Sequence, residues 1–170
     1  MDLAALVRDV PDFPEQGILF RDITTLLRDP KAFHSAIDQL AEKVQGIEID
    51  LVVAVESRGF ILGAPLAYKL GVGFVPVRKP GKLPAQTISA EYSLEYGISK
   101  LEIHTDAIQA GQRVLVVDDL LATGGSSRAT IELVERLGGK VVGVAFLIEL
   151  LFLNGMDRLA GYNAFSIIQY

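Results

Sequence analysis

The stretch Val114–Ser127 constrains this chain more than any other segment, because it joins three chemically different parts in one line. The apolar, β-branched run at 113–117 is too short for a buried helix, so it predicts a buried parallel strand. Asp118 and Asp119 follow, and then a turn that holds two glycines and three hydroxyl residues. We therefore expect a strand that ends at two adjacent carboxylates, then a tight turn, then a helix that starts near Ser126.

The turn at 123–127 has the composition of a phosphate site. Its glycines let backbone N–H groups converge, its hydroxyls add donors, and the helix that follows contributes the positive end of its dipole. In open α/β sheets, ligands bind beyond the carboxyl ends of the strands. Since carboxylates repel phosphate, Asp118 and Asp119 are expected to meet sugar hydroxyls, directly or through a divalent cation. The combination predicts a site for a ribose 5-phosphate group.

The turn by itself also permits a purely structural interpretation. The glycines then form an ordinary tight turn, and Ser126 is a helix N-cap. The paired acids favour a ligand site, because adjacent strand residues point to opposite faces and both carboxylates would otherwise need hydration at a buried strand end. The chain contains neither the G-x-x-x-x-G-K-[ST] motif of a P-loop nor G-x-G-x-x-G, so the predicted phosphate site is of a different kind.

Strands that alternate with helices predict a parallel, doubly wound α/β sheet in one domain of 170 residues. Asp29 and Pro30 suit the N-cap and first position of a helix that ends at Gly46. A second helix is expected at 59–70 and is stopped by Gly71. The further strands are expected at 51–55, 74–77, 141–150 (a central strand) and 165–168 (an edge element).

Two segments interrupt this alternation. After a short N-terminal helix, residues 10–25 are rich in proline and glycine and predict an irregular arm. Residues 87–104 alternate around Gly97 and predict a hairpin or flap. We expect residues 1–28 to form a small hood and residues 80–105 to form the flap, as the specificity and lid elements of the domain.

Composition narrows the classes of function. The net charge of −5 and a pI near 5.0 argue against a nucleic-acid-binding surface. No apolar run reaches the roughly 18 residues of a membrane span, and the first residues do not resemble a signal peptide. The absence of cysteine excludes disulfides and thiolate metal sites and fits a reducing cytoplasm. His34 and His104 match no metal-ligand spacing and are interpreted as structural.

Basic residues gather after two other strands. Arg58 follows the strand at 51–55, where its guanidinium could hold phosphate oxygens bidentately. Arg78, Lys79 and Lys82 follow the third strand, and the strand order would bring them near Arg58. Four cations balance a diphosphate well, especially where Mg²⁺ screens part of its charge. The alternatives are an ordinary βα loop with a solvated arginine and a solvated basic turn.

Two more segments have possible chemical roles. Glu95 lies between apolar residues in the predicted flap, where closure over a ligand would raise its pKa and let it exchange a proton. Phe13 and Phe20 offer faces for stacking, and the turn at Gly17 exposes main-chain groups that could recognise the edge of a flat heterocycle. The alternatives are a solvated acid on a surface hairpin and an arm held in place by its aromatic side chains.

With these motifs in chain order, the sequence closely resembles the adenine phosphoribosyltransferases, a branch of the type I phosphoribosyltransferase family. Val-Val-Asp-Asp-Leu-Leu-Ala-Thr-Gly-Gly-Ser is similar to the motif that binds phosphoribosyl diphosphate throughout the family. Gly-Ile-Leu-Phe-Arg-Asp-Ile, Glu-Ser-Arg-Gly-Phe, Arg-Lys-Pro-Gly-Lys-Leu-Pro and Tyr-Ser-Leu-Glu-Tyr-Gly mark the adenine branch. The run Ala85-Gln86-Thr87, at the base of the flap, departs from many relatives.

The resemblance implies a mostly parallel, doubly wound sheet with an N-terminal hood and a flexible β-hairpin flap. It implies purine salvage, in which adenine and 5-phosphoribosyl 1-diphosphate give AMP and diphosphate. Mg²⁺ is implied as a cofactor that is held mainly through the substrate, without direct protein ligands. A cytoplasmic homodimer that binds neither nucleic acid nor membrane is expected.

The resemblance also implies a role for each matching residue. The 5-phosphate is assigned to Ala122, Thr123, Gly124, Gly125 and Ser126, and the ribose hydroxyls to Asp118 and Asp119. The diphosphate is assigned to Ser57, Arg58, Arg78, Lys79 and Lys82, and adenine to Leu19, Phe20 and Arg21. Glu95, as the group that handles the purine proton, and Arg58 are the expected catalytic residues. A non-proline cis peptide is expected between Ser57 and Arg58.

Two rival functions share this fold. A regulator that only senses phosphoribosyl diphosphate should lack the flap acid and carry a basic DNA-binding element, whereas this chain has Glu95 and is acidic. A hypoxanthine–guanine or orotate enzyme would lack this N-terminal hood. The adenine branch is therefore the preferred interpretation.

Overall fold

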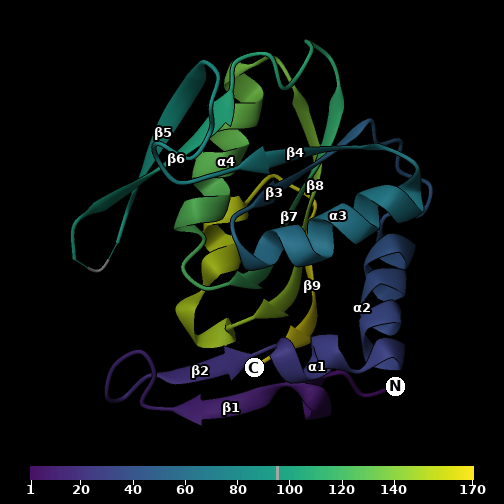
Figure 1. The fold of residues 1–170 in the computed structure, drawn as a ribbon, viewed down its shortest axis with the longest axis vertical. Helices are drawn as coiled ribbons and strands as arrows, with labels where there is room; N and C mark the ends of the chain where they lie inside the picture. The colour runs from purple at the N-terminus through teal and green to yellow at the C-terminus, as the bar shows by residue number, and fades with distance from the viewer. Residues whose placement is uncertain (95) are drawn as a thin grey trace.

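A five-stranded sheet forms the centre of the computed structural model, which describes residues 1–94 and 96–170. Its strands lie in the order β4-β3-β7-β8-β9, and each neighbouring pair is parallel (Figure 1). The predicted parallel α/β sheet is thus confirmed, with β9 at an edge. The bounds of these strands are β3 Leu51–Val55, β4 Gly73–Val77, β7 Arg113–Leu121, β8 Lys140–Glu149 and β9 Ala164–Gln169.

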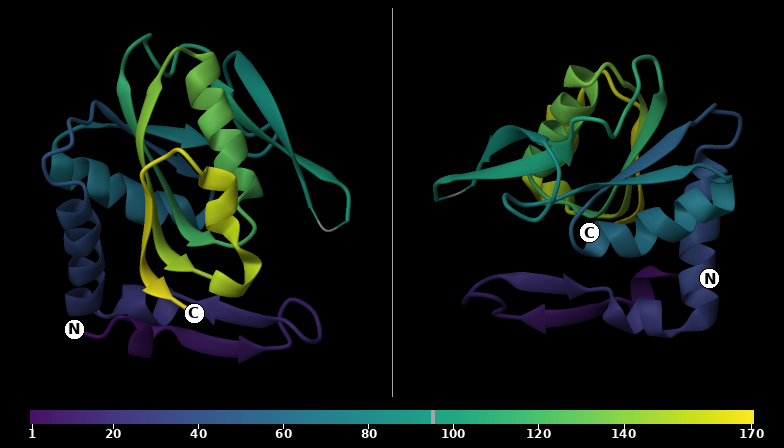
Figure 2. Two further views of the ribbon diagram at one scale, coloured as in Figure 1. Left: turned by 180° about the vertical axis from the view of Figure 1, so that it is seen from behind. Right: turned by 45° about the horizontal axis from the view of Figure 1, so that its top comes forward.

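The sheet is apolar on both faces, because helices cover each of them. Val52 and Ala54 of β3 belong to one buried cluster, which also contains residues of α2 (Pro30–Lys43) and α3 (Arg58–Leu70). Val53 and Val55 belong to a second cluster, which includes α4 (Gly125–Arg136) (Figure 1 and Figure 2). Alternate residues of one strand therefore supply two cores, as the doubly wound arrangement requires.

The helix starts follow local chemistry. The Asp29 carboxylate accepts the N–H groups of Lys31 and Ala32 at 2.9 and 3.0 Å, and Pro30 occupies the first turn of α2. This confirms the predicted start, but α2 ends at Lys43, before Gly46. Gly71 ends α3 in the left-handed conformation with φ of 70°, as predicted.

The N-terminal segment is more regular than predicted. The expected irregular arm instead forms an antiparallel hairpin of β1 (Arg8–Pro11) and β2 (Leu19–Asp22), followed by the short helix α1 (Thr24–Arg28). Opposite charges on the paired strands hold the hairpin together, because Arg8 pairs with Asp22 and Arg21 pairs with Asp9. The expected N-terminal helix is a single 3₁₀ turn, η1 (Ala4–Leu6).

Strand β7 is longer than predicted. It continues through Asp118 and Asp119 to Leu121, so the expectation that it ends at the two acids is wrong. The reason is its neighbour β8, which pairs with it as far as Leu121 opposite Glu149. The neighbour on the other side, β3, pairs only as far as Val117. Both aspartates therefore lie where β7 keeps one partner strand and has lost the other.

The predicted hairpin is confirmed as β5 (Thr87–Ser93) and β6 (Ile98–His104), which pair antiparallel. Its base belongs to the core, since Ala90, Leu101 and Ile103 are buried in the cluster that includes α4. In Figure 1 this hairpin extends to the left of the sheet and the β1–β2 hairpin lies below it. Within the described residues, no helix has the length and apolar character needed to cross a membrane.

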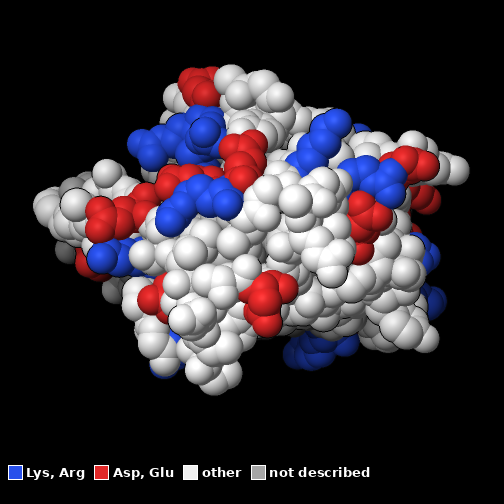
Figure 3. All heavy atoms as spheres, turned by 90° about the horizontal axis from the view of Figure 1, so that it is seen from above, with Lys and Arg blue, Asp and Glu red and all other residues white. Residues whose placement is uncertain are grey.

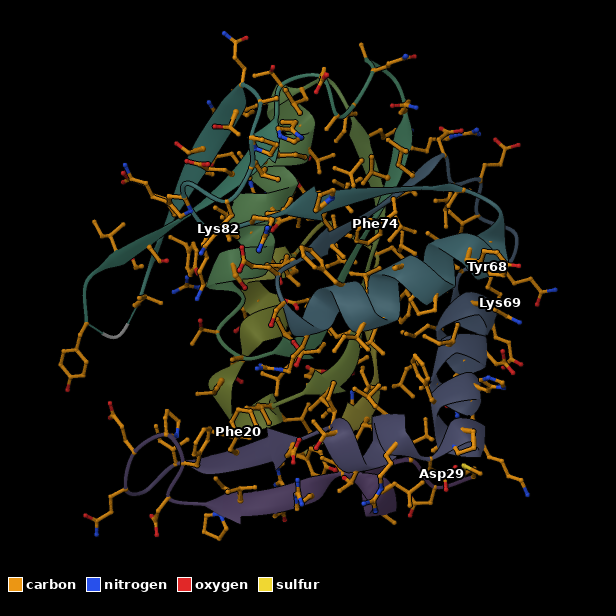
Figure 4. All side chains as sticks on the ribbon, in the orientation of Figure 1. Phe20, Asp29, Tyr68, Lys69, Phe74 and Lys82 are labelled. Carbon is orange, nitrogen blue, oxygen red and sulfur yellow. The ribbon has the colours of Figure 1, made fainter. Side chains whose placement is uncertain are left out.

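Helix α3 lies very close to the sheet at Gly63. A Cβ atom on Gly63 would lie 2.6 Å from the Cβ atom of Ala54 and 3.2 Å from the ring of Phe74. Phe74, labelled in Figure 4, also contacts Phe60 edge to face with 5.8 Å between ring centres. The absence of a side chain at Gly63 thus sets the distance between α3 and β3.

We expect Gly63→Ala to lower the free energy of unfolding by about 1–3 kcal/mol, because the added methyl group overfills a packed interface. Urea unfolding followed by circular dichroism measures the change. Ala64→Ser, at an exposed position of the same helix, is the control and should stay within about 0.5 kcal/mol of the parent. Equal stability of Gly63→Ala and the parent would contradict this account of the packing.

Candidate active site

Two buried aspartates lie where β7 has lost its neighbour β3. Asp118 and Asp119 are only 8% and 7% exposed. The N–H of Asp119 donates to Oδ1 of Asp118 at 2.9 Å, and Nε of Arg58 contacts Oδ2 of Asp119 at 2.5 Å. Arg58 is the first residue of α3. The ion pair therefore joins the ends of two adjacent strands at one edge of the sheet.

The two aspartates have different electrostatic surroundings. Burial and the neighbouring charge of Asp119 raise the pKa of Asp118 well above its usual range. Arg58 loses hydration, which by itself lowers its pKa, but the Asp119 carboxylate more than offsets this and the pKa of Arg58 is raised. The charge of Asp119 is thus compensated by Arg58, whereas burial and the charge of Asp119 oppose the ionisation of Asp118.

Gly59 allows α3 to start beside these acids. A Cβ atom on Gly59 would lie 2.9 Å from Oδ1 of Asp118 and 3.3 Å from the carbonyl oxygen of Val117. The first turn of α3 can therefore approach β7 only because this position has no side chain. The Ser57-Arg58-Gly59 sequence is in this way fitted to the aspartate pair.

The glycine-rich turn after β7 borders a cavity of about 700 Å³. The N-cap of α4 is Gly124, with φ of 85°, so the helix starts at Gly125 and the alternative of Ser126 as its N-cap is wrong. The described lining also includes residues from the β5–β6 hairpin and from the segment after β8. The turn residues on this cavity are Ala122, Thr123, Gly124, Gly125, Ser126 and Ser127.

A second cavity, of about 310 Å³, lies over the aspartates. It shares Tyr92, Leu120 and Ser126 with the first cavity, so the two adjoin. Its other lining residues include Glu56, Ser57, Arg58, Lys79, Asp118 and Asp119. The structure thus brings together side chains from the ends of β3, β4 and β7, some of which are more than about sixty residues apart in the sequence.

Glu56 connects the basic turn to this cavity. Its Oε1 accepts from Nε of Arg78 at 3.1 Å and from the N–H of Lys79 at 2.8 Å. As predicted, β4 and β3 are neighbours, and this places the basic turn beside Arg58. Lys79 lines the second cavity, whereas Arg78 and Lys82 are outside the described lining of both cavities. Lys82 is exposed and is labelled in Figure 4.

Phe20 connects the β1–β2 hairpin to the aspartate site. The guanidinium carbon of Arg58 lies 5.4 Å from the centre of its ring, and the Phe13 ring contacts it edge to face at 5.2 Å. Figure 4 shows Phe20 on the side of β2 that faces the sheet. Leu19 is 44% exposed. The side chain of Arg21 is held elsewhere, because it pairs with Asp9 and stacks 3.7 Å from the ring centre of Tyr170.

The predicted position of the cis peptide is wrong, and the prediction for Glu95 is not tested. The non-proline cis peptide joins Glu56 to Ser57 rather than Ser57 to Arg58. Ser57 already has near-helical torsions, φ −107° and ψ −35°, so the bond that follows it belongs to the start of α3. Glu95 lies outside the described residues, and its neighbour Leu94 lines the 700 Å³ cavity.

Comparison with known proteins agrees with this geometry. Residues 22–164 match the model of the phosphoribosyl transferase domain. The adenine phosphoribosyltransferase of Acetivibrio thermocellus is 60% identical over the full length of both chains. The chain belongs to the adenine phosphoribosyltransferase family.

Solved structures of the family match the fold closely. The enzyme from Thermoanaerobacter pseudethanolicus has a TM-score of 0.98 and 57% identity, with 99% of this chain and 98% of that chain covered. The Saccharomyces cerevisiae enzyme, in complex with adenine and an imino-altritol bisphosphate, has a TM-score of 0.91 and 44% identity, with 97% and 96% covered. The type I phosphoribosyltransferase fold is therefore confirmed.

Several cavity residues had no role predicted from the sequence. Tyr92 is on the β5–β6 hairpin, Leu120 is in the extension of β7, and Leu153 and Arg158 belong to the 3₁₀ turns η2 (Leu151–Leu153) and η3 (Gly155–Leu159). Tyr92 and Leu120 lie within motifs quoted above but have no polar role there that marks them, and Leu153 and Arg158 lie in none of those motifs. Only the packing of the segment after β8 against the glycine-rich turn brings the last two into the site.

The raised pKa of Asp118 predicts a conflict between stability and activity. The folded state holds the Asp118 proton more tightly than the unfolded state, so its ionisation weakens folding as the pH rises above about 4, the usual carboxyl range. We expect Asp118→Asn to raise the free energy of unfolding at pH 7 while activity falls, because asparagine removes the buried charge. The gain should disappear near pH 3.

Urea unfolding between pH 3 and pH 8 measures this difference. Asp119→Asn is the matched control: it should lower stability, because it leaves Arg58 without its ion-pair partner. A stability of Asp118→Asn equal to or below that of the parent at pH 7 would show that the Asp118 charge is well compensated in the folded state.

Proposed function

We propose that this enzyme transfers the 5-phosphoribosyl group of 5-phosphoribosyl 1-diphosphate to N9 of adenine, giving AMP and diphosphate in purine salvage, within the two adjoining cavities. The observation that carries this proposal is the buried Asp118–Asp119 pair, joined to Arg58 in the lining of the smaller cavity, which adjoins the larger one at Leu120 and Ser126. A sugar that carries an anion at each end fits such a site, because its hydroxyls meet the acids and its anions extend to either side.

The ribose is placed over the aspartates. Its hydroxyls donate hydrogen bonds to the Asp118 and Asp119 oxygens. Hydrogen bonds to a carboxylate are strong, so the sugar replaces the hydration that the buried acids lack. In the reaction the C1–O bond to diphosphate breaks and the bond from C1 to N9 forms. The sugar ring gains positive charge in this step, so fixed carboxylates beneath it stabilise the transition state.

The diphosphate leaves toward the ends of β3 and β4. Arg58 and Lys79 border that cavity, and Ser57, Arg78 and Lys82 lie on the same two loops. Nε of Arg58 is engaged by Asp119, which leaves its two terminal nitrogens to donate to the leaving group. The growing negative charge of diphosphate is thereby neutralised as C1–O breaks.

The 5-phosphate occupies the glycine-rich turn. Ala122, Thr123, Gly124, Gly125 and Ser126 line the larger cavity at the N-terminus of α4. Backbone N–H groups of a first helical turn point outward without partners, and they suit an anion.

Adenine binds between the hood and the aspartates. Phe20, close to Arg58, offers its ring for stacking, and Leu19 and Arg21 contribute main-chain groups. The yeast relative binds adenine in its solved structure, which supports this assignment. Glu95 accepts the proton that N9 releases, so the nucleophile gains electron density as it attacks C1.

Mg²⁺ fits this site as an ion that arrives with the substrate. In the described residues, no three or more His, Cys, Asp or Glu side chains form a group that could hold a metal. Mg²⁺ commonly keeps several of its waters and binds substrate phosphates, so the diphosphate would hold it without a direct protein ligand. When bound, the ion neutralises charge on the diphosphate.

A homodimer in the cytoplasm completes the proposal, on the basis of the family resemblance.

A substrate panel tests the proposed reaction. With 5-phosphoribosyl 1-diphosphate and Mg²⁺, we expect AMP formation from adenine and turnover at least about 100-fold lower for hypoxanthine, guanine and orotate, because a site built to hydrogen-bond one base leaves groups unpaired with another. Liquid chromatography of the nucleotide products measures this. Turnover of another base instead of adenine, or none at all, would exclude the proposal.

A separate variant tests the proton acceptor. We expect Glu95→Ala to lower kcat by about 100-fold or more with KM values nearly unchanged, because general-base catalysis contributes in the transition state and little to binding. Steady-state kinetics measure both constants. Glu91→Ala is the control on the same hairpin, since the exposed Glu91 pairs with Lys100 at 3.3 Å. An unchanged kcat in Glu95→Ala would remove Glu95 from the mechanism.

A further inference from the structure

The glycine-rich turn contains no positive charge of its own. Residues 122–127 offer N–H and hydroxyl donors only, and the nearest charged residues along the chain are Asp119 before the turn and Arg128 after it, whose guanidinium contacts the Tyr162 hydroxyl instead. A phosphate monoester carries between one and two negative charges at pH 7. Hydrogen-bond donors alone leave that charge unbalanced in a hollow next to two carboxylates.

Arg158 is the only lysine or arginine in the described lining of the 700 Å³ cavity. Its Nη1 atom lies 3.5 Å from the point that a Cβ atom on Gly125 would occupy, and its own Cβ lies 3.2 Å from the corresponding point on Gly124. The side chain therefore runs along the first turn of α4. None of the ion pairs in the described part of the chain involves Arg158.

Two glycines fix the segment that carries Arg158. A Cβ atom on Gly155 would lie 2.3 Å from the carbonyl oxygen of Ala122, and one on Gly124 would lie 2.7 Å from the carbonyl oxygen of Gly155. These distances are too short for any side chain. The backbone of η3 thus packs directly on the turn, and Arg158 is held beside it by a rigid contact rather than by a flexible loop.

We propose that Arg158 binds the 5-phosphate of the substrate and of AMP, as the cation that the turn itself lacks; this rests on the proposed function. An arginine suits the position because its guanidinium can give two parallel hydrogen bonds to phosphate oxygens. The diphosphate is a poorer partner for Arg158, since Arg58 and Lys79 line the smaller cavity and Arg158 does not.

Arg128 provides a matched control. It is also an exposed arginine near the start of α4, but its Nη1 donates to the Tyr162 hydroxyl at 3.1 Å and it lies outside the described lining of both cavities. On the face drawn in Figure 3, basic and acidic side chains lie interspersed. Removing any one arginine changes the net charge of the protein and so changes its attraction for AMP, and the Arg128→Gln variant measures this effect.

The test compares ligands that differ only in the phosphate. Isothermal titration of AMP and of adenosine is carried out on the parent, Arg158→Gln, Arg158→Lys and Arg128→Gln. We expect Arg158→Gln to weaken AMP binding about tenfold to 100-fold, the usual effect of losing a charge-assisted hydrogen bond. The affinity for adenosine should stay unchanged. Arg158→Lys should recover part of the loss, and Arg128→Gln should resemble the parent.

Two further measurements separate binding from structure. In the parent, AMP affinity should rise between pH 5 and pH 7 as the phosphate gains its second charge, with a midpoint near pH 6; Arg158→Gln should flatten this rise. The KM for 5-phosphoribosyl 1-diphosphate should increase in Arg158→Gln while the KM for adenine does not. Equal losses for AMP and adenosine, or no loss of AMP affinity, would overturn the proposal.

Failure of the proposed function has a different signature. A parent protein that forms no AMP from adenine contradicts the reaction itself, whatever the Arg158 variants do. A parent that forms AMP, together with an Arg158→Gln variant that keeps the parental preference for AMP over adenosine, contradicts only the role of Arg158. Thermal unfolding by circular dichroism confirms that each variant is folded before titration.

Discussion

The ion pair between Arg58 and Asp119 is the contact on which the site depends. It joins the end of β3 to the unpaired edge of β7, and it compensates one of two adjacent buried acids. Without it, two carboxylates would share a poorly hydrated position at the edge of the sheet. With it, Asp119 is compensated, and the unfavourable burial of charge falls on Asp118, whose pKa is raised. The fold therefore keeps an electrostatic strain at the place where a sugar with hydroxyl donors can relieve it.

Close backbone contacts give this arrangement its rigidity. Gly59 lets α3 begin against Asp118, and Gly155 lets the segment after β8 pack on Ala122. The two hairpins approach the same edge from outside the sheet: Phe20 of β2 lies near Arg58, and Tyr92 of β5 borders both cavities. A rigid sheet edge bordered by two separate hairpins is suited to a ligand of several chemically different parts.

Local sequence signals predicted the elements that depend on local chemistry. The N-cap at Asp29, the left-handed end at Gly71 and the buried strand at 51–55 were all predictable, because capping, glycine torsions and hydrophobic runs act over a few residues. The length of β7 was not, since its end is set by pairing with β8. The β1–β2 hairpin was also missed, because its cross-strand ion pairs join residues more than ten positions apart and prolines obscured its pattern.

The sequence by itself determined the alternation of strands and helices, the acids and hydroxyls of the 118–127 motif and its likeness to one enzyme family, because each is a property of neighbouring residues. Only the tertiary structure decided which residues share a cavity. It placed Lys79 on the lining and Arg78 against Glu56, turned the Arg21 side chain to Asp9 and Tyr170, and brought Arg158 to the glycine-rich turn. These outcomes depend on strand order, register and backbone contact between distant segments, for which a single sequence carries no local signal.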